Sequence, residues 1–435
     1  MFQEVNTIFQ TFGASVVVPI IIFIIALLLR VKPKTAMMSA FYAGVGLTGF
    51  TWIITEFTPV VTKIVRQMVD NTGIKLPVVD IGWQAGSLAA FGSTVGLSFF
   101  VFGLLAELIL FALGVTKVFL PSNIWNNFGY MIWGTLAFYV THNYWLSLGL
   151  EFFMLLYSLV LAEIQADRWA DYYGIENTTV DSLHNIEQVI PAIILDPLWN
   201  LLGFNKVKMT PKDFQKKLGV FGEPITMGII LGLIITNVFA KAFIPIATEI
   251  DKQQKKRHGK NKNSRYDKKR WFLAVDDGVG YGESATLISG IILIPIMVLI
   301  AFILPGNKTL PVVDLIAIPY MIESIVAVTR GNILKVIARG IVWFSLGLYA
   351  ASWLSPVYTA AVAHYGVAVP TGVVLVTSFN LVARQLNALV FAAFISESPV
   401  WISLAIIIYL VMLFGLRKYR SQIWHYLNKM AMKNA

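Results

Sequence analysis

The sequence contains no cysteine and few charged residues. Without cysteine, the chain cannot form a disulfide, a thiolate metal site or a cysteine-borne phosphoryl intermediate. Its five histidines have no spacing suited to a metal ion, so we expect neither a metal nor a cofactor. Charged residues make up 13% of the chain, whereas soluble domains typically contain about 25%. This composition excludes an ordinary soluble protein.

Nucleotide-binding motifs are also missing. The glycine-rich stretch GVGYGE (Gly278–Glu283) has no lysine that could reach a phosphate. Neither a Walker loop nor a GxSxG motif occurs in the chain. We therefore do not expect this protein to hydrolyse ATP.

Hydrophobic residues, in contrast, make up 57% of the sequence, and the mean hydropathy is +0.70. Glycine and proline interrupt many of the apolar runs, as they do in transporters with broken helices. We predict an all-α polytopic membrane protein of about 10–11 transmembrane helices with re-entrant segments. The first run is expected to be a retained span, because Glu4 and no lysine or arginine precede it. The runs are Val16–Leu29, Met37–Thr55, Leu97–Leu113, Phe128–Val140, Trp145–Ala162, Ile225–Ala240, Thr286–Leu304, Val312–Val328, Ile341–Leu354 and Val400–Gly415.

The net charge of +10 is concentrated in four basic clusters between the apolar runs or after the last of them. Ten Lys and Arg residues lie in Lys252–Arg270, five in Lys206–Lys217, five in Arg417–Lys433 and three in Arg30–Lys34. Cytoplasmic loops of membrane proteins carry such an excess of positive charge. We therefore interpret the clusters as a topology signal and expect no nucleic-acid partner.

Two ordered matches indicate an inverted repeat. FGASVVVPII (Phe12–Ile21) resembles FGEPITMGII (Phe221–Ile230), and VVDIG (Val78–Gly82) resembles AVDDG (Ala274–Gly278). Five crossings before Lys206–Lys217 would place the second copy upside down relative to the first. The pentapeptide LPVVD also occurs twice, at 76–80 and 310–314, but its second copy follows a span rather than preceding one. We attribute the repetition of this pentapeptide to coincidence.

The repeat gives a domain prediction in which each half contains a scaffold part and a core part. The predicted topology is inconsistent at 223–250. Two membrane crossings there would need more residues than this segment contains. The predicted divisions are a first repeat at 1–205 (scaffold helices 1–75, core segment 76–205), a second repeat at 206–416 (scaffold helix 221–250, cytoplasmic basic loop 251–271, core segment 272–416) and a cytoplasmic basic tail at 417–435.

Five motifs together resemble those of the galactitol-type enzyme IIC permeases of the bacterial phosphotransferase system, which are relatives of the ascorbate permeases. The matching stretches occur in the family order and span most of the chain. They are VVDIGW (Val78–Trp83), IWN (Ile124–Asn126), FGEPITMGIILGLII (Phe221–Ile235), PGNKTLPVVDL (Pro305–Leu315) and RGN (Arg330–Asn332).

The resemblance implies a homodimeric, multi-pass protein of the bacterial inner membrane, with a scaffold domain holding the dimer and a core domain carrying the substrate. It implies alternating access by movement of the core. The polyol would be phosphorylated by a phosphocysteine on a separate IIB protein, which is itself supplied by IIA, so this chain would only translocate. The absence of cysteine agrees with that division of labour.

Three departures from the family pattern accompany the resemblance. An apolar segment after the FGEP span is missing around Ala240–Phe243, Gly282-Glu283 replaces a Gly-His pair, and Thr179–Ser182 replaces an IPHG-like stretch. These departures leave galactitol itself open as the substrate.

A polyol offers only hydroxyl groups, so its binding site needs carboxylates and amides, with aromatic faces for the C–H surface. Ionisable groups at membrane depth are functional candidates by default. Each candidate also has a structural alternative, such as a helix cap for the acids or a turn for Asn307. Glu283 is of special interest because it replaces the family's histidine. The candidate substrate-binding residues are Asp80, Glu223, Asp276, Glu283, Asn307 and Asp314.

Two other functions remain open from the sequence. An ion-coupled secondary carbohydrate transporter would need no phosphoryl donor. A degenerate, non-transporting paralogue would fit the missing segment near Ala240–Phe243.

Overall fold

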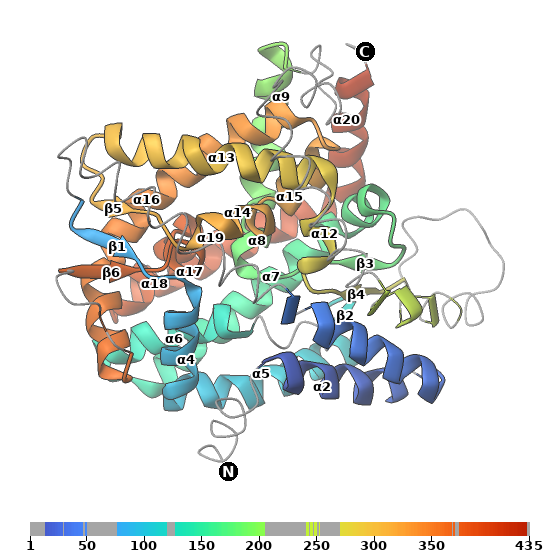
Figure 1. The fold of residues 1–435 in the computed structure, drawn as a ribbon, viewed down its shortest axis with the longest axis horizontal. Coiled ribbons are helices and arrows are strands. Elements are labelled where there is room, and N and C mark those ends of the chain that lie inside the picture. The colour runs from blue at the N-terminus through green and yellow to red at the C-terminus, as the bar shows by residue number, and fades with distance from the viewer. Residues whose placement is uncertain are drawn as a thin grey trace.

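The computed structural model describes residues 14–28, 30–46, 48–49, 76–119, 127–204, 241–242, 244–246, 248–249, 252, 270–367, 369 and 374–432. These residues form a mostly helical molecule with two small sheets (Figure 1). Glu223 and the FGEP motif lie outside the described residues.

Five described helices are long and apolar enough to cross a membrane, which confirms a multi-pass membrane protein. They match predicted runs, although α7 and α16 extend well beyond theirs. The predicted total of 10–11 spans remains a prediction, because part of the chain is outside the described residues. The five are α5 (Thr94–Ala112), α7 (Tyr144–Tyr173), α13 (Ser284–Ile303), α16 (Ile333–His364) and α19 (Pro399–Lys418).

Side-chain caps mark the beginning of three of these helices, α5, α7 and α16. Ser93 accepts a hydrogen bond from Gly96 N at the start of α5, Asn143 from Leu146 N in α7, and Asn332 from Lys335 N in α16. The remaining helices are shorter. They include α2 (Ala14–Leu28), α4 (Trp83–Gly92), α6 (Phe128–Thr141), α8 (Leu183–Ile186), α9 (Val189–Leu201), α12 (Gly278–Tyr281), α17 (Phe379–Val382), α18 (Gln385–Ile395) and α20 (Arg420–Met432), together with a helical stretch at 33–46.

The predicted span at 312–328 differs from the structure. It is broken into the 3-10 helix η3 (Asp314–Ala317), α14 (Ile318–Met321) and α15 (Glu323–Thr329). Pro319 cannot donate the hydrogen bond that would continue η3 as a regular helix. All residues of the three pieces are buried within the protein, so the apolar character of this run reflects a protein core rather than lipid contact.

Within the described residues, six short strands that were not predicted from the sequence form two parallel sheets of three strands each. One sheet has the order β5-β1-β6 and the other the order β2-β4-β3. In the first sheet, Val78 pairs with Thr309 and with Leu375. In the second, Leu273 pairs with Phe119 and with Thr178. The strands are β1 (Val78–Asp80), β2 (Val118–Phe119), β3 (Thr178–Thr179), β4 (Phe272–Ala274), β5 (Thr309–Leu310) and β6 (Leu375–Thr377).

The two sheets exchange strands between the halves of the chain. The central strand β1 lies early in the sequence, and both of its neighbours come from the block at 270–432. The central strand β4 lies late, and both of its neighbours come from the block at 76–204. Figure 1 shows one sheet on the left of the molecule and the other on the right, with α8 and α14 between them.

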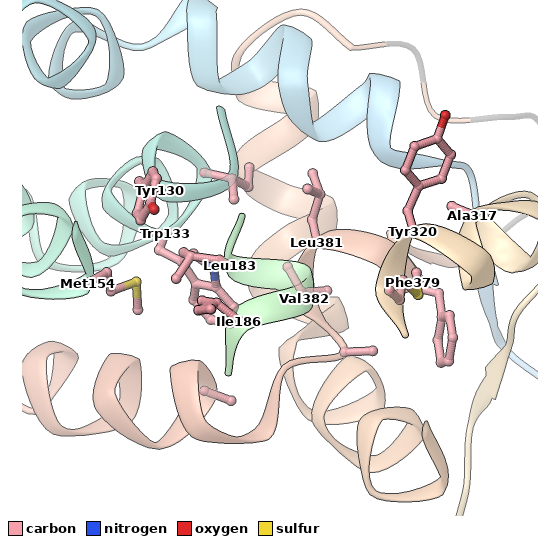
Figure 2. Packing of buried hydrophobic residues seen from close by; sticks show 14 of the residues in the cluster. Tyr130, Trp133, Met154, Leu183, Ile186, Ala317, Tyr320, Phe379, Leu381 and Val382 are labelled. Atoms are coloured by element: carbon pink, nitrogen blue, oxygen red, sulfur yellow. The ribbon is translucent and has the colours of Figure 1, made fainter. Parts of the chain in front are cut away.

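The buried hydrophobic core joins the two halves near these sheets. Leu183 and Ile186 of α8 belong to the same cluster as Leu381 and Val382 of α17. Figure 2 shows these side chains in one buried layer, with Trp133 of α6 nearby. The short helices α8 and α17 follow β3 and β6 directly. The core therefore fixes the segments that leave the sheets, which is where the polar side chains gather.

Candidate functional site

An aspartate follows the central strand of each sheet. Asp80 ends β1, and its Oδ1 accepts a hydrogen bond of 3.0 Å from Gly82 N. Asp276 lies just after β4, and its Oδ1 accepts a hydrogen bond of 2.8 Å from Gly278 N. These Asx turns redirect the chain from strand to helix. The pair predicted from the repeat thus occupies matching corners of the two sheets.

The first acidic centre consists of Asp80 and Asp314, both almost fully buried. Besides Gly82 N, Asp80 Oδ1 accepts from Phe379 N at 3.2 Å. Asp80 Oδ2 accepts from Val312 N at 3.2 Å and from Asp314 N at 2.7 Å. Its carboxyl group therefore ties β1 to the segments that follow β5 and β6.

Asp314 completes this centre with three further bonds. Its Oδ1 accepts from Trp83 N at 2.8 Å, at the start of α4. Its Oδ2 accepts from Ser378 Oγ at 2.6 Å and from Asn380 N at 2.8 Å. All four oxygens of the centre are thus occupied, six of the seven donors being backbone N–H groups. The capping alternative for Asp314 has support, although the helices it caps are α4 and α17 rather than its own segment.

The second acidic centre is built differently. It consists of Asp276, Asp277, Ser182, His184 and Glu323, which come from three distant parts of the chain and are all buried. Asp277 Oδ2 accepts a hydrogen bond of 2.9 Å from Ser182 Oγ and also contacts His184 Nε2. Two side-chain groups, Ser182 Oγ and His184 Nε2, are therefore among the partners of Asp277, whereas six of the seven donors to the first centre are backbone N–H groups.

Glu323 contributes an unused acceptor to the second centre. It is 0% exposed, its Oε2 accepts from Trp169 Nε1 at 3.4 Å, and within the described residues its Oε1 has no partner. Gly280 lies against this carboxyl group, and a side chain at that position would collide with it. An unsatisfied buried acceptor is costly. Glu323 Oε1 can therefore accept a hydrogen bond from a hydroxyl group of a bound molecule.

Aromatic rings surround this centre. The ring centroids of Tyr281 and Tyr320 are 4.5 Å apart, and those of Trp169 and Tyr173 are 4.6 Å apart. Rings of this kind cover the C–H surface of a carbohydrate. The acids, the hydroxyl, the imidazole and the rings together can bind a hydroxylated molecule. In the described part of the chain, no group of three or more His, Asp or Glu side chains could hold a metal ion.

Both aspartates that follow the central strands lie outside the five long apolar helices. Burial, together with the charge of Asp314, raises the pKa of Asp80 well above its ordinary value. Burial, together with the charge of Asp277, raises the pKa of Asp276 above its ordinary value. A protonated Asp276 can donate a hydrogen bond as well as accept one.

Glu283 caps helix α13. Its Oε1 accepts from Ala285 N at 3.1 Å, and its Oε2 accepts from Thr286 N and Thr286 Oγ1, both at 2.9 Å. Thr286 Oγ1 lies 2.9 Å from Tyr173 Oη, which connects Glu283 to the ring system of the second centre. The residue that replaces the family's histidine thus lies close to this centre but is occupied by its own helix.

Asn307 holds the turn before β5. Its Nδ2 donates to Ala301 O and Thr309 O, both at 2.8 Å, and its Oδ1 accepts from Thr309 N at 3.0 Å. The preceding Gly306 has φ +74°, which favours glycine. The geometry supports the turn alternative for Asn307.

Sequence reasoning missed Asp277, Ser182, His184 and Glu323. The doubled acid in AVDDG was one available signal for Asp277. Ser182 ends the stretch at 179–182 that replaces an IPHG-like motif, so the departure from the family pattern itself pointed to this region. Glu323 has no local signature, because only the break between α14 and α15 brings it to the centre.

Comparisons with known proteins give a consistent result. The sequence matches the family described as the sugar-specific permease component of the PTS system (EIIC-GAT), over residues 7–240 and 235–372. It is 24% identical over 391 residues to the "PTS system galactitol-specific EIIC component" of Escherichia coli K12, covering 84% of this chain and 86% of the relative. It is 25% identical over 377 residues to a "Putative permease IIC component" of the same organism, covering 80% and 84%. The two family matches meet beside Ala240–Phe243, where the sequence analysis expects a missing segment.

Proposed function

The chain belongs to the EIIC-GAT family of sugar-specific permease components of the phosphotransferase system, and from this premise we propose that it transports a galactitol-like sugar alcohol. As an EIIC component of the bacterial membrane, it works with a sugar substrate and with separate IIB and IIA proteins. The polyol assignment follows from the galactitol-specific relative together with the chemistry of the second acidic centre.

The observation that carries the proposal is the free acceptor of Glu323 beside the Asp277–Ser182–His184 group. A sugar alcohol presents alternating hydroxyl groups, each able to donate and to accept. Carboxylates accept from them, while Ser182 and His184 can exchange their bond to Asp277 for a bond to the substrate. Apolar and aromatic residues exclude water around these contacts.

The residues predicted from the sequence have different roles in this proposal. Asp276 and Glu283 act at the second centre, the first by contact and the second through the start of α13. Asp80, Asp314 and Asn307 hold the segments around the first sheet. Glu223 stays a candidate for substrate contact from the scaffold span that follows the FGEP motif.

Alternating access in this proposal relies on two inverted copies of one folding unit, with core segments at 76–205 and 272–416. The order of elements supports this: a strand, two helices, a strand, several helices of which the last is long, a strand, and further helices occur in both blocks. The exchange of strands between the two sheets supports it as well, because each central strand has the same relation to the other half.

A homodimer held by the scaffold helices is the proposed assembly. A groove of about 790 Å³ lies between α2 and the helical residues at 33–46 and 48–49. Its walls include Val16, Ile20, Phe41 and Val45, all between 45% and 62% exposed. Such an apolar groove on the proposed scaffold suits the same surface of a second copy.

The phosphoryl step belongs to another chain in this proposal. A phosphocysteine of IIB would transfer its phosphoryl group to a substrate hydroxyl, releasing the thiolate while the hydroxyl proton goes to a nearby base. This chain has no cysteine to serve as that donor. Its basic clusters at Lys206–Lys217 and Lys252–Arg270 offer charge for docking an acidic IIB face.

Reconstituted vesicles test the proposal. We expect uptake of radiolabelled galactitol or a related polyol only when phosphoenolpyruvate, IIA and IIB are present, with phosphorylated polyol as the product. Uptake driven by a proton or sodium gradient without IIB would instead indicate a secondary carrier. Loss of all polyol binding in calorimetry, with folded protein, would indicate a non-transporting paralogue.

A further inference from the structure

The basic segment that follows the last apolar run packs against the rest of the protein. Its described part forms helix α20, which lies on α9 (Figure 1). Trp424 and Leu427, on one face of α20, are 4% and 1% exposed, whereas Tyr426, on another face, is 49% exposed. Because one face is buried, α20 is an integral part of the molecule as well as a carrier of positive charge.

The polar contacts of this C-terminal region gather on one short stretch of α7. Trp424 Nε1 donates a hydrogen bond of 3.1 Å to Ile164 O, and Arg420 Nη1 donates one of 3.0 Å to Glu163 O. Arg417, near the end of α19, pairs with the Glu163 carboxylate through Nε at 3.2 Å and Nη2 at 2.9 Å. A bidentate pair of this kind sets orientation as well as distance. The C-terminal region is therefore held on α7 in one defined position.

This stretch lies beyond the apolar part of α7. The helix has 30 residues and is therefore about 45 Å long, whereas the hydrocarbon core of a bilayer is about 30 Å thick. The apolar run predicted from the sequence ends at Ala162, and the residues that contact the C-terminal region follow it directly. Charged side chains can be held there without the cost of placing them in lipid.

Arg168 connects this stretch of α7 to the substrate centre. Its guanidinium carbon lies 5.4 Å from the ring centroid of Trp424, so the cation stacks on the ring. Its Nη2 donates to Val328 O at 2.7 Å, and its Nε donates to Ala327 O at 3.3 Å. One side chain, which is only 6% exposed, thus contacts both α20 and the end of α15.

The end of α15 needs partners from outside the helix. This helix runs from Glu323 to Thr329 and ends where Arg330 takes φ 53°, outside the right-handed helical region. The carbonyl groups of its last turn have no donors within the helix, and a positive charge is favoured at that end. Arg168 supplies both the donors and the charge, so it holds the C-terminal end of α15 in place.

The start of α15 carries Glu323, the acceptor of the second acidic centre. Trp169, the residue after Arg168, donates from Nε1 to Glu323 Oε2 at 3.4 Å. Two successive residues of α7 therefore contact the two ends of α15. The helix has 7 residues, and such a helix is only about 10 Å long. A displacement of its C-terminal end is thus expected to move Glu323 as well.

The same stretch of α7 also holds β4, the strand that leads to Asp276. Asp167 Oδ1 accepts from Arg270 Nη1 at 2.7 Å, and Arg270 Nε donates to Asn177 Oδ1 at 2.6 Å. Arg420 Nη2 lies 3.9 Å from the other oxygen of Asp167. Both segments that bring acids to the second centre are therefore connected to α7 beside α20.

We propose that Arg168 is a positioning residue for substrate binding and that α20 sets the position of Arg168 through Trp424. While α20 is docked, Arg168 holds the end of α15 and thereby keeps Glu323 in the second acidic centre. The C-terminal helix thus influences polyol affinity without touching the polyol. This influence rests on the proposed function, in which Glu323 contacts the substrate, whereas the link from α20 to α15 does not depend on it.

Hydrogen–deuterium exchange of the purified full chain tests the link without any substrate. Arg168→Lys keeps the charge but loses the planar fork of donors, and Trp424→Leu loses the ring and its donor. We expect the backbone amides of α15 to exchange at least roughly tenfold faster in both variants, with unchanged exchange in α5. Trp424→Phe, which keeps a ring, should give a smaller increase. Tyr426→Leu, at an exposed position of the same helix, is the matched control and should leave α15 unchanged.

Polyol uptake in the presence of phosphoenolpyruvate, IIA and IIB tests the consequence for binding. We expect KM to rise roughly three- to tenfold in Arg168→Lys and in Trp424→Leu, with kcat changed less than about twofold, because a ground-state contact is displaced. The double variant should have the KM of Arg168→Lys alone, because Trp424 acts through Arg168. Tyr426→Leu should keep the wild-type KM.

Three results would overturn the proposal. Faster exchange throughout the chain in both variants would give α20 only a general role in stability. Additive changes of KM in the double variant would separate Trp424 from Arg168. Unchanged exchange of α15 in folded Arg168→Lys protein would remove the link itself. Absence of uptake by the wild-type protein would instead contradict the proposed function, and the exchange experiment would then decide the link alone.

Discussion

The two acidic centres occupy matching corners of two sheets, yet they are satisfied in different ways. Around Asp80 and Asp314, six backbone N–H groups and one serine occupy all four oxygens. Around Asp276 and Asp277, the neighbours include the side chains Ser182 and His184, and the adjacent Glu323 has one oxygen without a partner among the described residues.

This difference distinguishes a structural role for the first centre from a ligand-binding role for the second. A backbone N–H cannot leave its acceptor without moving a strand or a helix, so the first centre is suited to fixing the fold. A side-chain hydroxyl or imidazole can rotate to a new partner at small cost. The same corner of the fold has therefore been used for structure in one sheet and, in our proposal, for recognition in the other.

The largest expected effect tests the holding role. Asp80→Asn replaces one acceptor oxygen with a donor, which leaves buried backbone N–H groups such as those of Val312 and Asp314 without a partner. We expect the free energy of unfolding to fall by about 3 kcal/mol. Thermal unfolding and the monodisperse fraction in detergent would measure it. The exposed acid Asp171→Asn serves as the control, and an Asp80→Asn protein as stable as that control would remove the distinction.

The next effect tests the binding role. Asp277→Asn weakens the hold on Ser182 and His184 and removes a charged acceptor. We expect phosphoenolpyruvate-dependent polyol uptake to fall about 100-fold in kcat/KM, as for the loss of one or two charge-assisted hydrogen bonds. Stability should change less than in Asp80→Asn. A variant that transports normally would place recognition elsewhere.

Glu323→Gln sharpens the comparison, because it keeps the shape of the side chain and removes its charge. We expect the unfolding temperature to stay the same or rise, since a buried carboxylate is costly. The KM for the polyol should rise about tenfold through the loss of the free acceptor. Gly280→Ala, which pushes the Glu323 carboxyl group aside, should raise KM in the same direction. Opposite shifts in the two variants would argue against this acceptor.

The smallest effect concerns the helix caps that follow the two corners. Glu283→Ala removes the cap of α13, and Ser93→Ala removes the cap of α5. Each should lower the free energy of unfolding by about 1 kcal/mol. If Glu283 acts only by capping, both variants change polyol KM equally little. A larger KM change in Glu283→Ala would add this residue to the direct contacts.

The apolar helices could be predicted from the sequence because their signal is local. The runs near 97–113, 286–304 and 400–415 match α5, α13 and α19 to within a few residues. The run at 312–328 has the same composition but is broken, because burial inside a protein and burial in lipid select the same residues. Only the polar side chains that surround the run within the core distinguish a buried protein segment from a membrane span.

The strands and the partners of the site could not be predicted in the same way. A strand of two or three residues carries no periodicity, and β5 is recognisable only because Val78 pairs with Thr309 far along the chain. Repeat logic located Asp80 and Asp276. It could not reveal that Glu323, from the broken run, completes one centre while backbone groups close the other.

The exchanged strands also constrain the biosynthesis of the protein. When residues 78–80 leave the ribosome, neither neighbour of β1 exists, and the second of them arrives only with residues 375–377. Unpaired strand edges invite wrong partners. The first sheet can therefore be completed only near the end of translation, when residues 375–377 have been synthesised.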